Sequence, residues 1–510
     1  MKTMKTAMIL ALALTMLLSA LPMAASAGGK GDFDQNNRVD TNDVRLLMNS
    51  LAKGKDITLT QQLWTDMDMD SKLSTTDARM LLSAVMMDSI SPVKDYAKPT
   101  GEDHWGENSI AVLGDSISFG VGTSNDSKTD GSDASLFNLT GGIPERSYVS
   151  YVKKAVQNAN GGKMNYGFTS AYTTAWPGVA RSEEIHYWPA RSSKSGSTDW
   201  VCDNNDDGAR LTSVAMTSVT PWSSISYRLR KAYVSRYSYF TVYYQCEPNA
   251  GSFTIANGSG GEIPYADGKA AGYIPTHSSD GTSTTKRTQF FKLSDCAKDS
   301  NGSPIIEIFH DGTSNPVTIT GIGYYKALPK TDNADGYVTF NSFTRGGISL
   351  INLSDDVLDK ATSADTFIMG LGFNDFNFNH VRVNNGEFKA KIDTLIRLCN
   401  EKGTQVIVND YAIRNPVLYA NWIDSQKSAN AVVKSELRRF AEETNGVYID
   451  QEAIWGDALY ASVNDKNEIG ANSSMTEGDK IHPNHAGHKM MAQAVVAALG
   501  LSEYFTENWS

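Results

Sequence analysis

The stretch Ile110-Ala111-Val112-Leu113-Gly114-Asp115-Ser116 decides the fold. Four consecutive apolar residues that end in a glycine are typical of a short strand buried on both faces. Similar runs occur at residues 366–369, 405–408 and 446–449, and each precedes a stretch with helical periodicity. Because strands that alternate with helices form parallel sheets, we expect an α/β domain with helices on both faces of the sheet.

This alternation stops over residues 187–328. The region is rich in Ser, Thr, Gly, Tyr and Asp, and Asn-Gly and Asp-Gly turn signals separate its short β-rich runs. Such a pattern predicts a β-sandwich, inserted between residues 108–186 and 329–508 of the α/β domain. Four aromatic residues of the insert could form a sugar-stacking face or belong to its core: Trp188, Trp200, Trp222 and Tyr243.

Two twelve-residue segments near the front of the chain, 32–43 and 66–77, place oxygen side chains at positions 1, 3, 5, 9 and 12. A calcium loop needs this spacing, with a backbone carbonyl at position 7. The predicted ligands are Asp32, Asp34, Asn36, the carbonyl of Arg38, Asp40 and Asp43, and then Asp66, Asp68, Asp70, the carbonyl of Lys72, Ser74 and Asp77. An apolar helix follows each loop. We therefore expect two structural calcium ions; the alternative is two solvated acidic loops.

The first residues are typical of a secretory signal peptide. Lys2 and Lys5 precede an apolar run, and Ala25-Ser26-Ala27 gives the small-x-small pattern of a cleavage site, so residues 1–27 are predicted to direct secretion. No other stretch approaches the roughly 20 apolar residues of a membrane-spanning helix. Further along, residues 91–101 contain two prolines and no periodicity, and they predict a linker over residues 94–107.

The charge and the cysteine content narrow the possible partners. The formal net charge is −11, and no basic run is present, which argues against nucleic acid and anionic membrane surfaces as partners. Four cysteines in 510 residues do not make a disulfide framework.

Three polar groups follow predicted strands or precede the last helical stretch. Ser116 comes directly after the strand 110–113, where ligands of doubly wound sheets bind. Asn374 follows the strand at 366–369, and a neutral amide there could donate to an oxyanion. Asp479 lies three residues before His482, close enough to hold the tautomer that leaves Nε2 free as a base. A metal cluster of Asp479 and His482 with His485 and His488 is the weaker reading, because Pro483 breaks the local helix and no further ligand follows.

Together and in this order, residues 114–116, 372–375 and 479–482 resemble the three sequence blocks of the SGNH (GDSL-like) hydrolase superfamily. The resemblance implies a flavodoxin-like three-layer α/β fold and ester hydrolysis that requires no catalytic cofactor. It assigns Ser116 as the nucleophile, His482 as the general base and Asp479 as the carboxylate that orients it.

By the same resemblance, the oxyanion is held by the Ser116 N–H, the Asn374 side chain and a glycine N–H of a further block. Two segments compete for that block, residues 165–170 and 341–347. The second keeps the expected Asn-to-Gly spacing, and it favours Gly346 as the donor, with Gly347 next.

The loop-helix repeat of residues 28–93 resembles a type I dockerin, a small all-α calcium-binding module. That resemblance implies a cohesin domain of a scaffoldin as the partner. Both resemblances together predict a secreted, cellulosome-associated serine esterase that deacetylates a plant cell-wall polysaccharide, acetyl-xylan or another hemicellulose. A pectin acetylesterase or a feruloyl esterase remains open, as does a non-catalytic polysaccharide-binding component.

Overall fold

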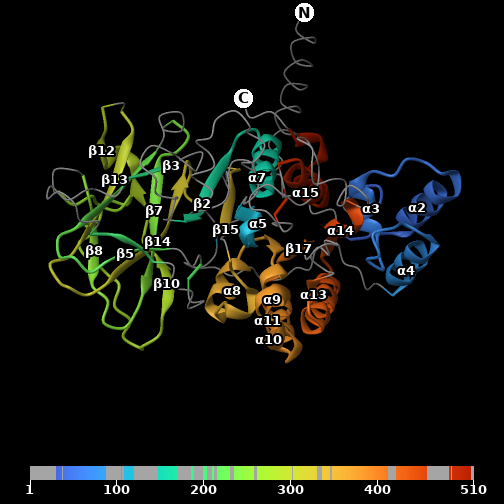
Figure 1. Cartoon of the computed structure of the whole chain (residues 1–510). Coiled ribbons are helices and arrows are strands. Elements are labelled where there is room, and N and C mark those ends of the chain that lie inside the picture. The colour runs from blue at the N-terminus through green and yellow to red at the C-terminus, as the bar shows by residue number, and fades with distance from the viewer. Residues whose placement is uncertain are drawn as a thin grey trace, which may run out of the picture.

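The computed structural model describes residues 30–36, 38–87, 105, 108–119, 147–170, 185–188, 199–203, 210–211, 215–229, 235–257, 261–300, 302–329, 336–344, 347–411, 421–455, 482–483 and 485–506. The predicted signal peptide lies outside them. Figure 1 shows a β-rich part at one end, a helix-covered sheet in the middle and the loop-helix module at the other end. None of the described helices is long and apolar enough to cross a membrane.

A parallel sheet forms the centre of the molecule. Its six strands are β2 (Met164–Ser170), β15 (Val338–Thr344), β1 (Ser109–Gly114), β16 (Thr366–Gly370), β17 (Gln405–Asp410) and β18 (Val447–Asp450). Every neighbouring pair in this order is parallel, so all six carboxyl ends meet at one edge. The predicted α/β domain is therefore confirmed.

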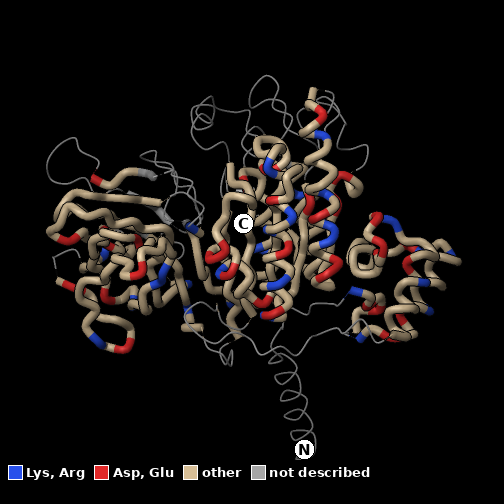
Figure 2. The backbone as a smooth tube through the Cα atoms, turned by 90° about the horizontal axis from the view of Figure 1, so that it is seen from below, with Lys and Arg blue, Asp and Glu red and all other residues tan. Residues whose placement is uncertain are grey.

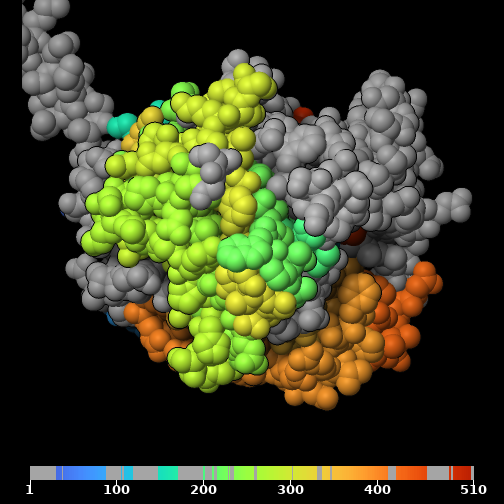
Figure 3. All heavy atoms as spheres, turned by 90° about the vertical axis from the view of Figure 1, so that its left-hand side faces the viewer, coloured from blue at the N-terminus to red at the C-terminus, as the bar shows by residue number. Residues whose placement is uncertain are grey.

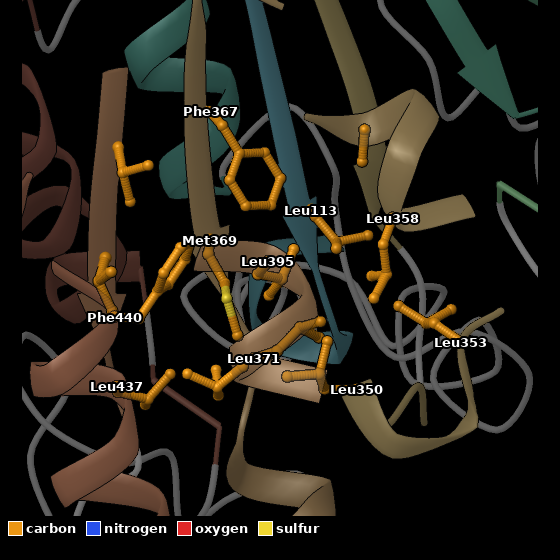
Figure 4. Packing of buried hydrophobic residues seen from close by; sticks show 14 of the residues in the cluster. Leu113, Leu350, Leu353, Leu358, Phe367, Met369, Leu371, Leu395, Leu437 and Phe440 are labelled. Carbon is orange, nitrogen blue, oxygen red and sulfur yellow. The ribbon is translucent and has the colours of Figure 1, made fainter. Parts of the chain in front are cut away.

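Helices cover both faces of this sheet. One face packs against α8 (Asp355–Ala361), α9 (Phe373–Phe378), α10 (His380–Asn384), α11 (Glu387–Lys402) and α13 (Asp424–Glu443). The other face packs against α7 (Tyr148–Ala159), α14 (Gln451–Trp455) and α15 (His485–Ala498). Strand β1 alternates between the two: Leu113 belongs to the first cluster, which Figure 4 shows with Phe367 and Met369, and Val112 belongs to the second. This alternation is why the strands read as continuous apolar runs.

The β-rich part shares a sheet with the α/β part. Strand β14 (Val317–Tyr325) pairs antiparallel with β2, β7 (Tyr239–Cys246) pairs with β14, and β10 (Thr284–Arg287) pairs with β7. Strands β4 (Val201–Asp203), β5 (Ala215–Ser218) and β11 (Phe291–Lys292) join the same sheet. The strands of residues 187–328 therefore do not form a detached body.

A second sheet faces this extension. It contains β3 (Ile185–Trp188), β6 (Ser224–Leu229), β13 (Pro304–His310), β8 (Ser252–Ala256), β9 (Ile274–Pro275) and β12 (Ala297–Lys298). Apolar side chains such as Ile225, Phe240 and Ile308 fill the space between the two sheets. Figure 3 shows the outer side of this part, green to yellow, beside the orange helices of the α/β part.

Trp200 and Tyr243 follow the alternative in which these aromatic residues belong to the core. Both are buried in the core, so neither ring is available to a polysaccharide. Trp222 is exposed, but its ring packs closely on Gly312. A Cβ at that glycine would lie 2.4 Å from the ring. The side chain of Trp188 lies outside the described part.

The loop-helix module contains α2 (Thr41–Lys53), α3 (Leu59–Thr65) and α4 (Thr75–Met86). Leu47 of α2 and Leu81 of α4 meet in a small core of their own. Helix α3 instead packs on the α/β part: Trp64 joins the core around α15, and its Nε1 donates to the carbonyl oxygen of Ala498 at 3.1 Å. The module is therefore attached through a packed interface and not only through a linker.

Trp105 corrects the predicted linker over residues 94–107, of which it is the one described residue. Its indole is buried, donates to the carbonyl oxygen of Lys360 at 2.9 Å, and packs against Tyr243 and Phe343. A large aromatic side chain gains free energy from such burial, which composition alone did not reveal. Trp105 therefore belongs to the core of the α/β part.

The surface of the helices carries charges of both signs. Figure 2 shows acidic and basic residues interspersed along them. On α11, Lys389 pairs with Asp393 and Arg397 with Glu401, each one turn apart. Such exposed pairs contribute little stability, about 0.3–0.5 kcal/mol each, and act mainly to keep the face soluble.

Candidate active site

Ser116 and His482 meet at the carboxyl edge of the parallel sheet. Ser116 follows β1 by two residues and begins the short helix α5 (Ser116–Phe119). The Oγ of Ser116 lies 2.9 Å from Nε2 of His482, although 366 residues separate them in the chain. Both side chains are half-buried, so a substrate could reach them. A hydroxyl within hydrogen-bonding distance of an imidazole has the geometry of a nucleophile and its general base.

The other two predicted partners, Asp479 and Gly346, lie outside the described residues. Their assignments as the orienting carboxylate and as an oxyanion donor remain predictions. Of the competing segment 165–170, Asn165 is buried and its Oδ1 accepts the N–H of Lys326 at 2.9 Å.

Glycines at two strand ends make room for a cluster of hydroxyl groups. A Cβ on Gly114 would lie 1.9 Å from Oγ of Ser118, and a Cβ on Gly370 would lie 2.6 Å from the hydroxyl of Tyr148. Any side chain at either position would displace these hydroxyls. The requirement for glycine in Gly114-Asp115-Ser116 is thus steric.

The hydroxyl cluster consists of Ser118, Tyr148 and Tyr411. Ser118 Oγ lies 2.7 Å from the hydroxyl of Tyr148 and 2.9 Å from that of Tyr411. The Tyr411 hydroxyl also lies 2.9 Å from Oδ1 of Asp115 and contacts the carbonyl oxygen of Gly370. All of these atoms are buried. The cluster joins the turn that carries Ser116 to the ends of β16 and β17.

Asp115 supports that turn from inside. Its Oδ1 accepts the N–H of Ile117 at 2.9 Å, while its Oδ2 is buried with no hydrogen-bond partner among the described residues. Burial raises the pKa of Asp115 to about 7, and the bonds from Ile117 and Tyr411 and the nearby His482 oppose that rise. A carboxyl group in this position holds the backbone next to Ser116.

Asn374 and Asp375 hold the loop that follows Gly346. The Nδ2 of Asn374 donates to the carbonyl oxygen of Ile348 at 3.0 Å. Asp375 accepts the N–H groups of Leu350 and Ile351, each at 3.0 Å. Burial raises the pKa of Asp375 to about 6, and these N–H bonds oppose the shift. The sequence singled out Asn374 but not Asp375, whose only signal was its place beside it.

His488 of α15 packs against Tyr148, the first residue of α7. It is fully buried, its Nδ1 accepts the N–H of Tyr148 at 3.2 Å, and its ring stacks on Tyr148. These contacts join α15 to α7. The position of the His485 side chain lies outside the description.

The two predicted calcium loops share one hydrogen-bonding pattern. Oδ1 of Asp43 accepts the N–H of Phe33 at 2.9 Å, as Oδ1 of Asp77 accepts that of Met67 at 2.8 Å. The described part of the chain contains two clusters of three carboxylates, and within each cluster the carboxylates lie within 4.8 Å of one another. The clusters are Asp32, Asp34 and Asp43, and Asp66, Asp68 and Asp70. Burial, helped by the neighbouring carboxylates, raises the pKa of Asp66 to about 7.

Parts of the chain are similar to known proteins. Residues 288–495 match the family model GDSL-like Lipase/Acylhydrolase, a match that begins well after Ser116. An uncharacterized esterase of Bacillus subtilis (strain 168), YxiM, is 29% identical over 143 residues, which are 28% of this chain and 36% of that protein. The chain thus matches about a third of the length of that relative.

Two solved structures are also similar in part. One is described as a peptidoglycan O-acetylesterase in action: it is 13% identical, with a TM-score of 0.42, over 78% of this chain and 91% of that one. The other is a variant of an acetyl xylan esterase from Geobacillus stearothermophilus: it is 17% identical, with a TM-score of 0.24, over 34% of this chain and 76% of that one. The family match and the curated relative agree with the predicted chemistry. Residues 288–495 are thus similar to a GDSL-like lipase/acylhydrolase domain, and a relative that aligns with 143 residues of the chain is named an esterase.

Proposed function

We propose that this protein is a secreted, cellulosome-associated serine esterase that removes acetyl groups from a plant cell-wall polysaccharide, acetyl-xylan or another hemicellulose. The observation that carries the catalytic part is the 2.9 Å contact between Ser116 Oγ and His482 Nε2 at the carboxyl edge of the sheet. An inactive binding component would have no need of this contact.

In the proposed reaction, Ser116 Oγ attacks the acetyl carbonyl carbon while Nε2 of His482 takes its proton. His482 then returns that proton to the sugar oxygen as the ester bond breaks. A water molecule repeats the sequence on the acyl-enzyme and releases acetate. Asp479 would hold the imidazole throughout.

The developing oxyanion would be held by the N–H of Ser116, the N–H of Gly346 and the side chain of Asn374. The bond from Asn374 Nδ2 to Ile348 uses one of two amide hydrogens, so the same nitrogen can donate the other. Because Asn374 and Asp375 grip the loop after Gly346, the two donors would be positioned together.

Calcium fits the two acidic loops. Their donors are all oxygens, as this hard cation prefers, and the carboxylates of Asp32, Asp43 and Asp66 are buried close to like charges. The residues that would hold the two ions are the twelve ligands predicted above. Bound calcium would neutralise these carboxylates and stabilise the module.

The docking role rests on an apolar surface of the module. Five side chains of α2, α4 and the residue after it are exposed: Met48, Met80, Leu82, Met86 and Met87. Helix α3 is covered by the hydrolase, so this surface on α2 and α4 would receive a cohesin domain. The acetylated plant polysaccharide as substrate follows from that docking proposal.

Acetate and ferulate release from a panel of native polysaccharides tests the substrate. The proposal is supported if the protein releases acetate from acetyl-xylan and the Ser116→Ala variant does not. Ferulate release alone, or acetate release from pectin alone, would select one of the other esterases. No release from any polysaccharide, with an intact fold, would favour the binding component.

Calcium titration of the full chain tests the module. Two ions are expected, and Asp32→Ala combined with Asp66→Ala should remove both. The whole chain is required because α3 packs into the hydrolase core. Equal cohesin binding in excess chelator would contradict the proposal.

A further inference from the structure

A pocket of about 320 Å³ lies at the antiparallel end of the large sheet. Its lining includes Tyr265, Asp267, Arg287, Gln289 and Phe290. Arg287 ends β10, and four strands, β7, β14, β2 and β15, separate β10 from β1, which ends two residues before Ser116. At the usual spacing between strands this separation is roughly 24 Å. The pocket is therefore distinct from the catalytic site.

Arg287 brings a positive charge to the pocket. Its guanidinium lies near the hydroxyls of Tyr243 and Tyr325, and it lies 5.2 Å over the ring of Phe290. Both tyrosine hydroxyls donate to the carbonyl oxygen of Gly167, at 2.8 and 3.0 Å, so toward Arg287 they offer lone pairs. These contacts fix the plane and position of the guanidinium.

No carboxylate of the described residues forms an ion pair with Arg287. The nearest candidate in the lining, Asp267, pairs instead with Lys269 at 2.9 Å. A guanidinium has five N–H donors in a fixed fork, and two tyrosine oxygens do not use them all. A half-buried arginine with remaining donors favours a planar, bidentate anion such as a carboxylate.

The other lining residues suggest what bears that carboxylate. The rings of Tyr265 and Phe290 are half-buried and offer flat apolar surfaces, and the exposed amide of Gln289 can both donate and accept. Aromatic faces beside an amide suit a pyranose ring, which has an apolar C–H face and a rim of hydroxyls. The volume is at the small end of ligand sites and would hold one or two sugar rings.

We propose that this pocket binds a uronic acid residue of the polysaccharide, with the carboxylate on Arg287 and the sugar ring against Tyr265 and Phe290. The choice of a sugar as the bearer of the carboxylate rests on the proposed function. The pocket would anchor an acidic side group of the chain while an acetyl ester some distance along it reaches Ser116.

Calorimetric titration of the full-length Ser116→Ala variant tests this, because the variant binds without turnover. The two probes are a glucuronic acid-bearing xylo-oligosaccharide and the same compound with its carboxyl group reduced to an alcohol. The acidic probe should bind at least about tenfold more tightly, as expected for a charge-assisted bidentate pair. Arg287→Gln should abolish this preference, and Arg287→Lys should keep only part of it.

Lys298→Gln is the matched control, since Lys298 is an exposed cation on the second sheet, and it should leave the preference unchanged. If Arg287→Gln lowers the thermal midpoint, Gln289→Ala, which changes an exposed side chain, should still weaken the acidic probe several-fold. Equal binding of both probes to the parent variant would overturn the proposal. So would displacement of the acidic probe by an equal concentration of acetate. Because this experiment measures binding and not catalysis, its result can be interpreted even if the protein proves to have no esterase activity.

Discussion

Tyr411→Phe tests whether the hydroxyl cluster positions the nucleophile. The substitution removes one oxygen and leaves the ring, which is fully buried, in place. That oxygen contacts Oδ1 of Asp115, Oγ of Ser118 and the carbonyl oxygen of Gly370. Ser118 keeps its bond to Tyr148, and Asp115 keeps the N–H of Ile117. The groups that lose a hydrogen-bond donor are therefore the carboxylate of Asp115 and the carbonyl of Gly370.

A buried polar group left without its partner costs about 1–3 kcal/mol. The Tyr411 hydroxyl has one proton to donate to these two acceptors, so we expect a decrease of about 1–3 kcal/mol in the free energy of unfolding, measured by urea denaturation. Because Asp115 supports the turn of Ser116, the alcohol should also become less well placed for attack. A displacement near 1 Å can cost about 10²-fold in rate. We therefore expect kcat on a soluble acetate ester to fall about 10- to 100-fold with little change in KM.

Tyr448→Phe is the matched control. Tyr448 lies on β18, which β16 and β17 separate from β1. Its hydroxyl is also buried and contacts a carboxylate, Oδ2 of Asp410 on β17. The control should lose stability and keep kcat. If Tyr411→Phe also keeps kcat within about twofold while losing stability, the cluster is structural only and the positioning role is refuted.

Ser116→Ala and His482→Ala should each abolish ester hydrolysis with an unchanged circular dichroism spectrum, and the double variant should be no worse, because the two groups act as a unit; substantial activity in either would exclude the serine mechanism. Asn374→Ala should lower kcat about 10²–10³-fold, as loss of one oxyanion donor does; a change in KM alone would make it a substrate contact. Since burial raises the pKa of Asp115 to about 7, the folded state binds its proton more tightly than the unfolded state, and stability is lost as pH rises from about 4 to 7. Relative to wild type, Asp115→Asn should gain up to roughly 4 kcal/mol between pH 4 and 8 in denaturant titrations, and a pH-independent difference would contradict this. Trp64→Ala should cost about 3–5 kcal/mol of unfolding free energy without lowering kcat, and equal stability would mean that α3 is not packed on the hydrolase in solution.

Much of the α/β part follows from local pattern. A strand buried on both faces must be apolar at every position, so runs such as residues 110–113 and 366–369 were visible in the sequence, and both are strands in the structure. The pairing of Ser116 with His482 was also predictable, because both flank recognisable motifs. Asp479 and Gly346 remain predictions on the same basis.

The hydrogen bonds that support those motifs could not be predicted from the sequence. The cluster contains Tyr411, Tyr148 and Ser118, which lie in different parts of the chain. Their spacing in the sequence does not predict that their hydroxyl groups are in contact. Asp375 looked like an ordinary neighbour of Asn374. Such contacts depend on which strand ends lie side by side, and that is a property of the sheet order.

The sequence by itself determined the strands, the candidate pair Ser116 and His482, and the oxygen spacing of the acidic loops, because each depends on residues close together in the chain or on a motif. Only the tertiary structure decided that β14 extends the parallel sheet, that Trp105 and Trp64 are core residues, and that Arg287 lines a pocket. These features arise from pairing and burial between distant segments. The free energy of such contacts depends on the partner that folding supplies, and no local pattern records that partner.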